Sequence, residues 1–317
     1  MRNLNCKNCG SAMIYDVSSM MAHCRFCGTS YVLDHQDTDY FKTFYRQMVD
    51  SSPKDEVRKQ RDDSLWEKAD AATFTTTEGQ VIELKYLHYY SDKCADVFVT
   101  RRNIAFHFRD GMNDKAEHFR KMVSSLDYPS ADTRSLSDFF PRVTGAFMLD
   151  DGTALVVINK REEEYPLRLF GKLGGRHIAW IISRLENLCC VLEYNGFVHP
   201  EIDVDTVYIN PNNHTACLYC NWWSVDHLNT RASDGHLLTS ADNLNGLRKT
   251  AKALLETEEE TPDTPKALLD FINSDPKFDA FEDFAFWDDM LIKAFGERKF
   301  IKMDTEDSDI YGKQDNT

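Results

Sequence analysis

Two short cysteine motifs near the N-terminus constrain the fold of this chain more than any other feature. Residues 6–10 read C-K-N-C-G and residues 24–28 read C-R-F-C-G, with fourteen residues between Cys9 and Cys24. Two residues between thiolates let one tight turn place both sulfurs about 2.3 Å from a single ion, and the following glycine permits the positive φ at which backbone amides approach sulfur. The two motifs therefore predict a closed tetrahedral site for one structural zinc ion, with the ligands Cys6, Cys9, Cys24 and Cys27.

A closed site of four thiolates is structural because it leaves no coordination position open for a substrate. Its binding energy acts as folding energy for residues 1–34, a segment too short to bury a core of its own. The segment resembles zinc ribbons, a module that binds proteins as well as nucleic acids. The alternatives are four unrelated thiols or a redox pair, and the doubled motif argues against both.

Composition limits the classes of protein to which the chain can belong. Its 317 residues are 42% apolar and 28% charged, which is typical of globular proteins of about two domains. No apolar run is long enough to span a membrane, and the first ten residues lack the apolar core of a signal peptide. We therefore expect a soluble cytoplasmic protein with no membrane contact.

The net charge and its distribution along the chain limit the kinds of partner that the protein can bind. The net charge of −15 opposes binding to phosphate backbones over most of the surface. Residues 1–31 are the exception, since Arg2, Lys7 and Arg25 outnumber the single acid Asp16. Any nucleic-acid contact is therefore expected through the ribbon alone.

Beyond the ribbon, the pattern predicts strands first and helices afterwards. Residues 35–71 indicate a polar helical connector. Alternating β-rich segments, a helix and the hairpin turn Asp150-Asp151-Gly152 follow. The strands are expected at residues 73–77, 80–89, 96–100, 103–108, 143–149 and 154–159, with the helix at 114–126. Apolar residues at helical spacing then predict a long helix that ends near Gly196, a short hairpin, and further helices. These last elements are expected at 206–209 and 215–219 for the hairpin, and at 244–255, 266–272 and 284–295 for the helices.

This order of elements resembles the bilobal protein-kinase fold. Residues 196–209, G-F-V-H-P-E-I-D-V-D-T-V-Y-I, resemble the catalytic-loop segment that follows a long helix in kinases. The resemblance implies an α+β fold, with a small antiparallel β lobe, a hinge near Tyr165 and Pro166, and a larger helical lobe. The expected boundaries are a ribbon at 1–34, a connector at 35–71, lobes at 72–165 and 166–303, and a flexible tail at 304–317.

Within the loop, the histidine of the kinase segment is present, but the groups that perform phosphoryl transfer in kinases are replaced by other residues. His199 matches the loop histidine. Glu201 stands at the position of the catalytic aspartate, and Asp203 reverses the charge of the lysine that follows it. Thr206 replaces the metal-binding asparagine. The loop therefore lacks the cation and the amide that a transferring phosphate and its metal require.

The remaining kinase positions are altered as well. Cys220 or Asn221 replaces the metal-binding aspartate, with one residue of ambiguity, and neither is a good ligand for magnesium. The turn at 89–96, where kinases carry glycines over the phosphates, contains none. The strand lysine corresponds to His107, and Glu117 is its expected helix partner, so that a His107–Glu117 contact would survive only as a structural pair.

Several residues near these positions have two interpretations. His199 is expected to anchor the loop from the core, the alternative being a catalytic group. Trp222 and Trp223 either fill the empty nucleotide cleft, which we favour, or form an exposed anchor for a partner. Asp203 and Asp205 are expected to be solvated acids, the alternative being a weak cation site together with Glu201. Cys217 and Cys220 have C-x-x-C spacing, but they lie in a strand pattern, which argues against a second metal site.

Together these features predict a zinc-ribbon pseudokinase. We expect it to be no enzyme, to bind no ATP and to act as a protein-interaction or regulatory module whose partner is another protein. The first alternative is an atypical phosphotransferase in which Glu201 acts as the base. The second is a nucleic-acid or transcription-associated accessory factor that acts through the ribbon.

Overall fold

The computed structural model describes residues 64–128, 136–232, 234–298 and 300–312, together with the backbone of four short strands nearer the N-terminus. These strands pair antiparallel in the order β1-β2-β3-β4, with the bounds Ile14–Asp16, Met21–His23, Thr29–Leu33 and Phe41–Arg46. The four predicted zinc ligands lie outside the described residues, so the zinc site stays a prediction. The helical connector is corrected in part, since β4 is a strand and the described helix is the short α1 (Ser64–Lys68).

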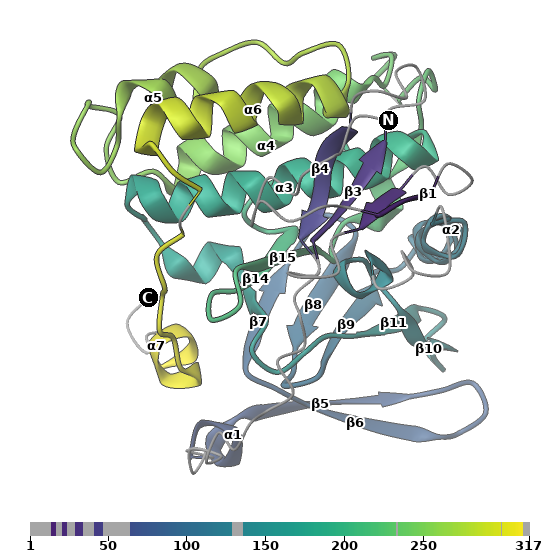
Figure 1. The fold of residues 1–317 in the computed structure, drawn as a ribbon. Helices are drawn as coiled ribbons and strands as arrows, with labels where there is room; N and C mark the ends of the chain where they lie inside the picture. Colours follow the sequence, from purple (N-terminus) through teal and green to yellow (C-terminus); the bar gives the residue numbers. More distant parts are fainter. Residues whose placement is uncertain are drawn as a thin grey trace.

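The first lobe is built on a five-stranded antiparallel sheet, as the sequence predicted (Figure 1). Its strand order is β10-β11-β9-β8-β7, with the bounds Val143–Met148, Ala154–Asn159, Asn103–Phe108, Ala95–Val99 and His88–Ser91. The predicted turn between β10 and β11 is present, with Gly152 at a φ of +84°. Helix α2 (Asn113–Ser124) packs on one face of the sheet through Ala116, Phe119 and Met122.

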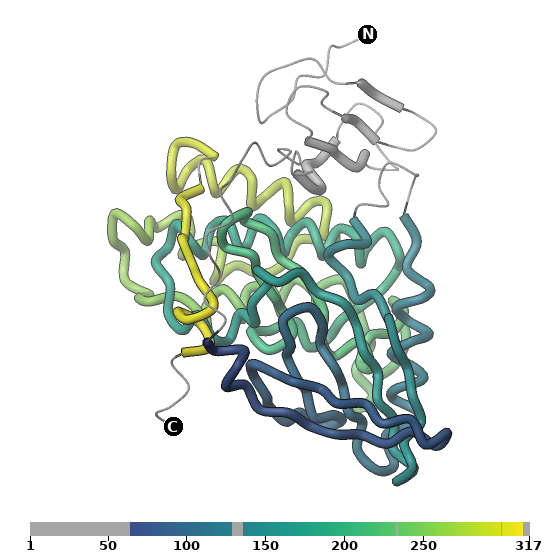
Figure 2. The backbone as a smooth tube through the Cα atoms, turned by 90° about the horizontal axis from the view of Figure 1, so that it is seen from below, coloured from purple at the N-terminus to yellow at the C-terminus, as the bar shows by residue number. Residues whose placement is uncertain are grey.

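A separate hairpin, β5 (Asp70–Thr75) and β6 (Val81–Tyr86), packs on the opposite face of the sheet. The prediction of one strand over residues 80–89 is therefore wrong, because the segment divides between β6 and β7, which belong to different sheets. The chain turns at Leu87, whose backbone N–H donates to the carbonyl of Val99 in β8. Figure 2 shows the hairpin as an arm along this lobe.

The second lobe begins after the predicted hinge, where β12 (Tyr165–Pro166) leads into the 3₁₀ turn η2 (Leu167–Phe170). The long helix α3 (Gly175–Asn195) lies at its centre and ends, as predicted, where Gly196 adopts a φ of +64°. Helices α4 (Ser240–Leu254), α5 (Lys266–Ile272) and α6 (Ala280–Phe295) complete the lobe. None of the helices in the described ranges combines the length and the apolar character needed to cross a membrane.

Short strands join α3 to α4. β14 (Val207–Asn210) pairs with both β12 and β15 (Thr215–Leu218), so the hinge strand is part of a three-stranded sheet. β13 (Phe197–Val198) pairs with β16 (Asp226–His227), and the 3₁₀ turn η3 (Trp222–Ser224) lies between β15 and β16. These elements hold the loop at 199–206 and the turn at 220–224 close together.

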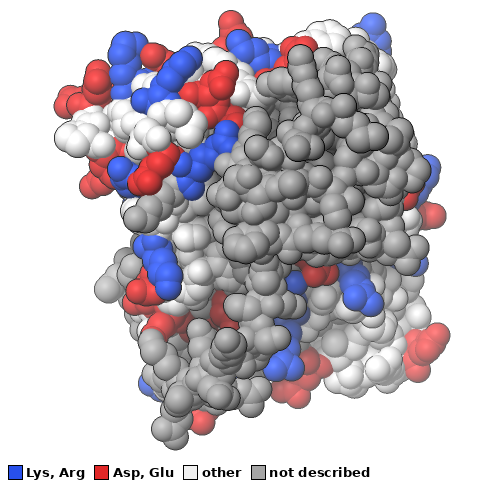
Figure 3. Space-filling model, in the orientation of Figure 1, with Lys and Arg blue, Asp and Glu red and all other residues white. Residues whose placement is uncertain are grey.

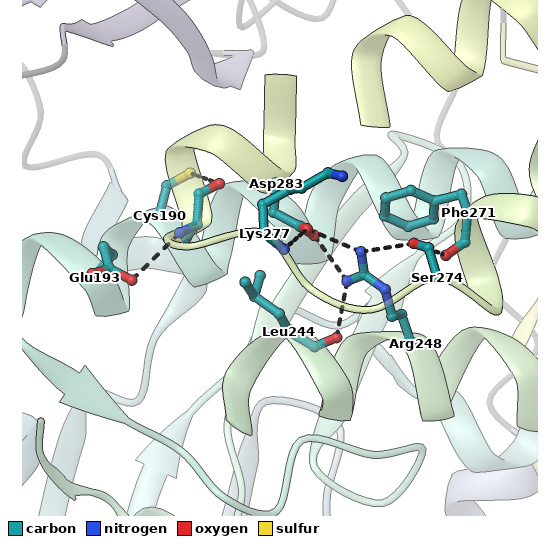
Figure 4. Close-up of polar contacts among 9 residues, drawn as sticks. Cys190, Glu193, Leu244, Arg248, Phe271, Ser274, Lys277 and Asp283 are labelled. Atoms are coloured by element: carbon teal, nitrogen blue, oxygen red, sulfur yellow. Dashed lines mark hydrogen bonds and ion pairs between the residues drawn. The ribbon is translucent and has the colours of Figure 1, made fainter. Parts of the chain in front are cut away.

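An ionic contact inside the helical lobe fixes α4 against α6 (Figure 4). The guanidinium of Arg248 donates to both carboxylate oxygens of Asp283, at 2.8 and 2.9 Å. The backbone N–H of Lys277 donates to the same carboxylate, and the ring of Phe271 lies 4.4 Å from the guanidinium carbon. Because Arg248 and Asp283 are both buried, each depends on the other for the neutralisation of its charge.

The C-terminal segment departs from the prediction of a flexible tail. Residues 307–311 form helix α7 (Asp307–Tyr311), and Ile310 and Tyr311 are only 5% and 6% exposed. The burial of these two residues could not be predicted from the sequence, because two apolar residues in an acidic stretch carry no periodic pattern.

Candidate functional site

The loop that resembles a kinase catalytic loop is tied directly to the turn that follows β15. The side-chain amide of Asn221 donates to Oε2 of Glu201 at 2.9 Å, and the hydroxyl of Ser224 donates to the same oxygen at 3.0 Å. Asn221 adopts a left-handed backbone conformation, with a φ of +57°. The alignment ambiguity is thereby resolved, since Asn221 rather than Cys220 faces Glu201.

Cys220 points instead into a buried contact between the two lobes. Its sulfur lies 3.5 Å from the hydroxyl of Tyr90, which belongs to β7 of the first lobe. The same hydroxyl lies 3.2 Å from the carbonyl oxygen of Asp205. Burial raises the pKa of the Cys220 thiol to about 12, so the sulfur is a neutral thiol at physiological pH.

Arg168, from η2, closes this contact on its outer side. Its guanidinium lies 4.8 Å from the centre of the Tyr90 ring and 3.1 Å from Oδ1 of Asp205. The Tyr90 side chain therefore bridges the sheet and the loop, and the cation nearest to it already pairs with a carboxylate. The sequence signal for this bridge was the replacement of glycine by bulky residues in the turn at 89–96.

Asp203 holds the backbone of its own loop. Its Oδ1 accepts the backbone N–H groups of Asp205 at 2.8 Å and Thr206 at 3.1 Å. The buried hydroxyl of Thr206 in turn accepts the N–H of Asp203. These bonds form a turn of the kind that aspartate side chains commonly stabilise. Burial also raises the pKa of Asp203.

Nothing in the described ranges gathers three or more histidine, cysteine, aspartate or glutamate side chains into a metal-binding group. The alternative of a weak cation site at Glu201, Asp203 and Asp205 is therefore not supported. The C-x-x-C pair is also not a site, because Cys217 faces Glu164 while Cys220 faces Tyr90.

His199 anchors the loop from the core, as the first interpretation predicted. It is fully buried, and its backbone N–H donates to the side-chain oxygen of Asn243. Its Nε2 donates to the carbonyl of Cys220 at 2.9 Å, which fixes the proton on that nitrogen because a carbonyl only accepts. Burial lowers the pKa of the imidazole, so it is neutral at pH 7.

The expected contact between His107 and Glu117 is absent, because the two side chains lie on opposite faces of the sheet. His107 contacts Thr153 Oγ1 at 2.9 Å and the ring of Phe74 in β5. Helix α2 packs on the other face, and Glu117 is exposed there. In β9 it is Phe106 that faces α2.

An aromatic cluster occupies the space between β9, α2 and η3. The ring of Trp223 lies 5.7 Å from Phe106, 5.4 Å from Phe108 and 6.2 Å from Phe119, measured between ring centres. Trp223 is 2% exposed and Trp222 is fully buried. The interpretation of these tryptophans as an exposed anchor is therefore wrong. The cluster has no charged member, so no lysine–glutamate pair of the kinase type lies between β9 and α2.

A second polar contact near the hinge was not anticipated from the sequence. The buried carboxylate of Glu164 accepts the hydroxyl of Tyr219 at 2.8 Å and the backbone N–H of Arg161 at 2.7 Å. It therefore ties the segment before the hinge to the strand end before Cys220. Glu164 follows Glu162 and Glu163, and nothing in the sequence marks it as the buried member of the three.

Charges on the visible face of the described residues are mixed. Figure 3 shows Lys and Arg interspersed with Asp and Glu, without a broad area of one sign among the coloured residues.

Comparisons with known proteins give structural likeness without a family. No protein-family model matches the chain, and no curated protein sequence matches it. Among solved structures, the ROP18 kinase domain in complex with AMP-PNP and sucrose is 15% identical, with a TM-score of 0.47, over 72% of this chain and 86% of that one. Vaccinia related kinase 3 is 12% identical, with a TM-score of 0.49, over 79% and 98%. The BubR1 kinase domain is 9% identical, with a TM-score of 0.45, over 66% and 85%. Because these TM-scores are below 0.5, the kinase-like arrangement rests on the chain's own five-stranded sheet, hinge and helical lobe.

Proposed function

We propose that the two-lobed body is a non-catalytic kinase-like module that acts on another protein through its outer surface. The observation that carries the proposal is the contact of Glu201 with Asn221 and Ser224. Phosphoryl transfer needs a base that receives the substrate proton and a metal ligand that neutralises phosphate charge. In this chain the carboxylate at the base position already accepts two hydrogen bonds, and an amide occupies the ligand position.

The packing between the lobes supports the same proposal. Tyr90 contacts Asp205 and Cys220 across the junction, and Trp223 packs among three phenylalanines. A nucleotide that entered this region would have to break those contacts. It would gain little in return, because Arg168 already pairs with Asp205 and His107 faces the opposite side of the sheet.

Calorimetric titration of the full chain with ATP, with and without magnesium, tests the proposal. We expect no magnesium-dependent binding to the wild type. The variant Asn221→Asp is the informative partner, since it places a second carboxylate beside Glu201 and should respond more strongly to magnesium. Magnesium-dependent ATP binding by the wild type that Glu201→Ala abolishes would overturn the proposal and favour the atypical phosphotransferase.

We further propose that Cys6, Cys9, Cys24 and Cys27 hold one zinc ion and that the ribbon contributes to recognition of the partner protein. Elemental analysis should find about one zinc per chain, and a Cys6→Ala/Cys24→Ala variant should lose it. Capture of partners by the wild type and by that variant then measures the contribution of the ribbon. Salt-dependent binding of nucleic acid that the variant loses would favour the accessory-factor alternative.

A further inference from the structure

The C-terminal strap, residues 300–312, leaves the helical lobe and crosses to the hinge (Figure 2). Its first attachment is at Phe300 and Ile301. Nε2 of His214 donates to the carbonyl of Ile301 at 2.7 Å, and the guanidinium carbon of Arg184 lies 5.6 Å from the centre of the Phe300 ring. Both of these contacts come from the helical lobe.

The second attachment is made by α7 on the hinge. The hydroxyl of Tyr165 donates to Oδ1 of Asp307 at 2.8 Å, and the rings of Tyr165 and Tyr311 lie 5.8 Å apart. Ile310 packs in the same cluster. Burial raises the pKa of both tyrosines, so each hydroxyl keeps its proton at physiological pH.

The apolar surface beneath α7, here called the hinge surface, is drawn from both lobes. Leu65 and Leu87 come from the segments that precede the five-stranded sheet, whereas Leu169 and Phe170 belong to η2 of the helical lobe. Tyr165 lies between them at the crossing point. A segment that packs on all of these residues restrains the first lobe relative to the second.

The attachment of α7 is short. The helix has five residues, far fewer than an isolated helix needs for stability in water, so its structure depends on the surface that it covers. Residues 302–306, between the two attachments, form neither helix nor strand. Short segments with few buried side chains open locally before the core unfolds.

We propose that the strap is a detachable clamp, with the hinge surface as its docking site and the chain's own α7 as the occupant. When α7 is docked, the two lobes are held together at the hinge; when it is released, an apolar surface rich in leucine and aromatic side chains is uncovered. The clamp is independent of the proposed loss of phosphoryl transfer, since none of its contacts involves Glu201 or Asn221.

Hydrogen exchange on the full-length protein is the first test. Amides of residues 307–311 should exchange at least tenfold faster than those of α3, through opening of the strap alone. Tyr311→Ala should accelerate exchange at residues 87–91 and 165–170 and leave α5 unchanged. Ser308→Ala, an exposed position in the same helix, is the matched control. Exchange of α7 only at the rate of α3, or a variant whose effect is the same in every helix, would overturn the proposal.

A labelled peptide of residues 300–317 provides the second test. It should bind an Ile310→Ala/Tyr311→Ala variant of the 317-residue chain, whose own α7 no longer docks, at least tenfold more tightly than it binds the wild-type chain, whose hinge surface is covered. A peptide with Ile310→Ala and Tyr311→Ala should not bind. Equal binding to both chains would overturn the proposal, as would exchange protection of α7 that disappears on dilution, because the strap would then dock between copies.

Discussion

Asp283 and Glu201 are two carboxylates that the same fold treats in opposite ways. Asp283 is fully buried in the helical lobe, where both of its oxygens accept hydrogen bonds from the guanidinium of Arg248. Glu201 is only partly buried and accepts hydrogen bonds from two neutral groups, the amide of Asn221 and the hydroxyl of Ser224. The helical lobe thus neutralises its acid with a cation, whereas the loop leaves its acid to neutral donors and to solvent.

The two carboxylates therefore differ in role, since Asp283 matters for stability whereas Glu201 matters for any chemistry at the loop. A buried charge without its partner is costly, so the pair of Arg248 and Asp283 is expected to be essential for folding. A partly solvated carboxylate with neutral partners contributes little to stability and needs an added cation to act on phosphate. Residues 199–206 contain no lysine or arginine that could supply such a cation.

Removal of the buried cation Arg248 should have the largest effect on stability. Arg248→Ala leaves Asp283 buried and unpaired, and we expect it to lower the free energy of unfolding by about 3–5 kcal/mol. Lys252→Ala, one turn later on α4, removes an exposed pair with Glu258 and should change stability by less than about 0.5 kcal/mol. Denaturant titration measures both. Equal losses in the two variants would remove the basis of the comparison.

The polar contacts between Tyr90 and the loop at 199–206 should contribute less to stability than the pair of Arg248 and Asp283. Tyr90→Phe removes the hydroxyl that contacts Asp205 and Cys220 and keeps the ring beneath Arg168, so we expect a loss of about 0.5–1.5 kcal/mol. Tyr89→Phe is the neighbouring control, since Tyr89 is 44% exposed and its hydroxyl makes a surface contact with the hydroxyl of Ser91 at 2.9 Å. Thermal unfolding of the two variants gives the contrast, and a larger loss for Tyr89→Phe would contradict it.

The pH dependence of stability can be tested at Glu186, which lies next to the buried pair of Arg248 and Asp283. It is fully buried beside Asp283, and burial raises its pKa well above the usual value of 4.5, with a further contribution from the Asp283 carboxylate. A raised pKa for a carboxyl means that the folded state binds its proton more tightly, so the wild type loses stability as the pH rises above about 4.5.

Glu186→Gln replaces this carboxyl by a neutral group of nearly the same shape. Relative to wild type, the variant should become more stable as the pH rises from 4 to 8, because it has no carboxyl that must lose a proton in the folded state. Unfolding curves across this range test the sign. Glu282→Gln, at an exposed position of α6, should show no such trend. A variant whose stability relative to wild type falls between pH 4 and pH 8 would contradict the expectation.

Glu201→Gln should have the smallest effect. The amide oxygen of glutamine can still accept from Asn221 and Ser224, so we expect a change within about 0.5 kcal/mol. Asp283→Asn removes the same charge from the helical lobe and should cost several times more, because it leaves Arg248 buried without its counter-charge. Comparable losses for the two substitutions, measured in the same denaturant, would show that the loop carboxylate also has a structural role.

Local patterns in the sequence were sufficient for much of the fold. β-Rich segments bounded by turn residues predicted β8, β9, β10 and β11, and apolar residues at helical spacing followed by Asn195-Gly196 predicted α3 and its end. The hinge near Tyr165 and the loss of phosphoryl transfer stay predictions from the sequence. The prediction for the loop rests on residue types, since residues 199–206 contain no lysine, arginine or asparagine.

Other features were beyond local patterns. A slip of one residue in a strand moves a side chain to the other face of the sheet, and for this reason His107 was wrongly placed opposite Glu117. The choice between Cys220 and Asn221 depended on the turn after β15, where a left-handed residue directs one side chain towards Glu201 and the other towards Tyr90. Neither could be decided without the strand register.

By itself, the sequence determined the order of strands and helices, the two cysteine motifs and the absence of lysine and arginine from residues 199–206, since each depends on residues close together in the chain. Only the tertiary structure decided which carboxylates are paired, which tryptophans are buried and where α7 docks. Tyr165 and Asp307 are 142 positions apart, and Tyr90 and Cys220 are 130 apart. Contacts at such separations leave no periodic signal, because they depend on how whole elements pack and not on the residues adjacent to them.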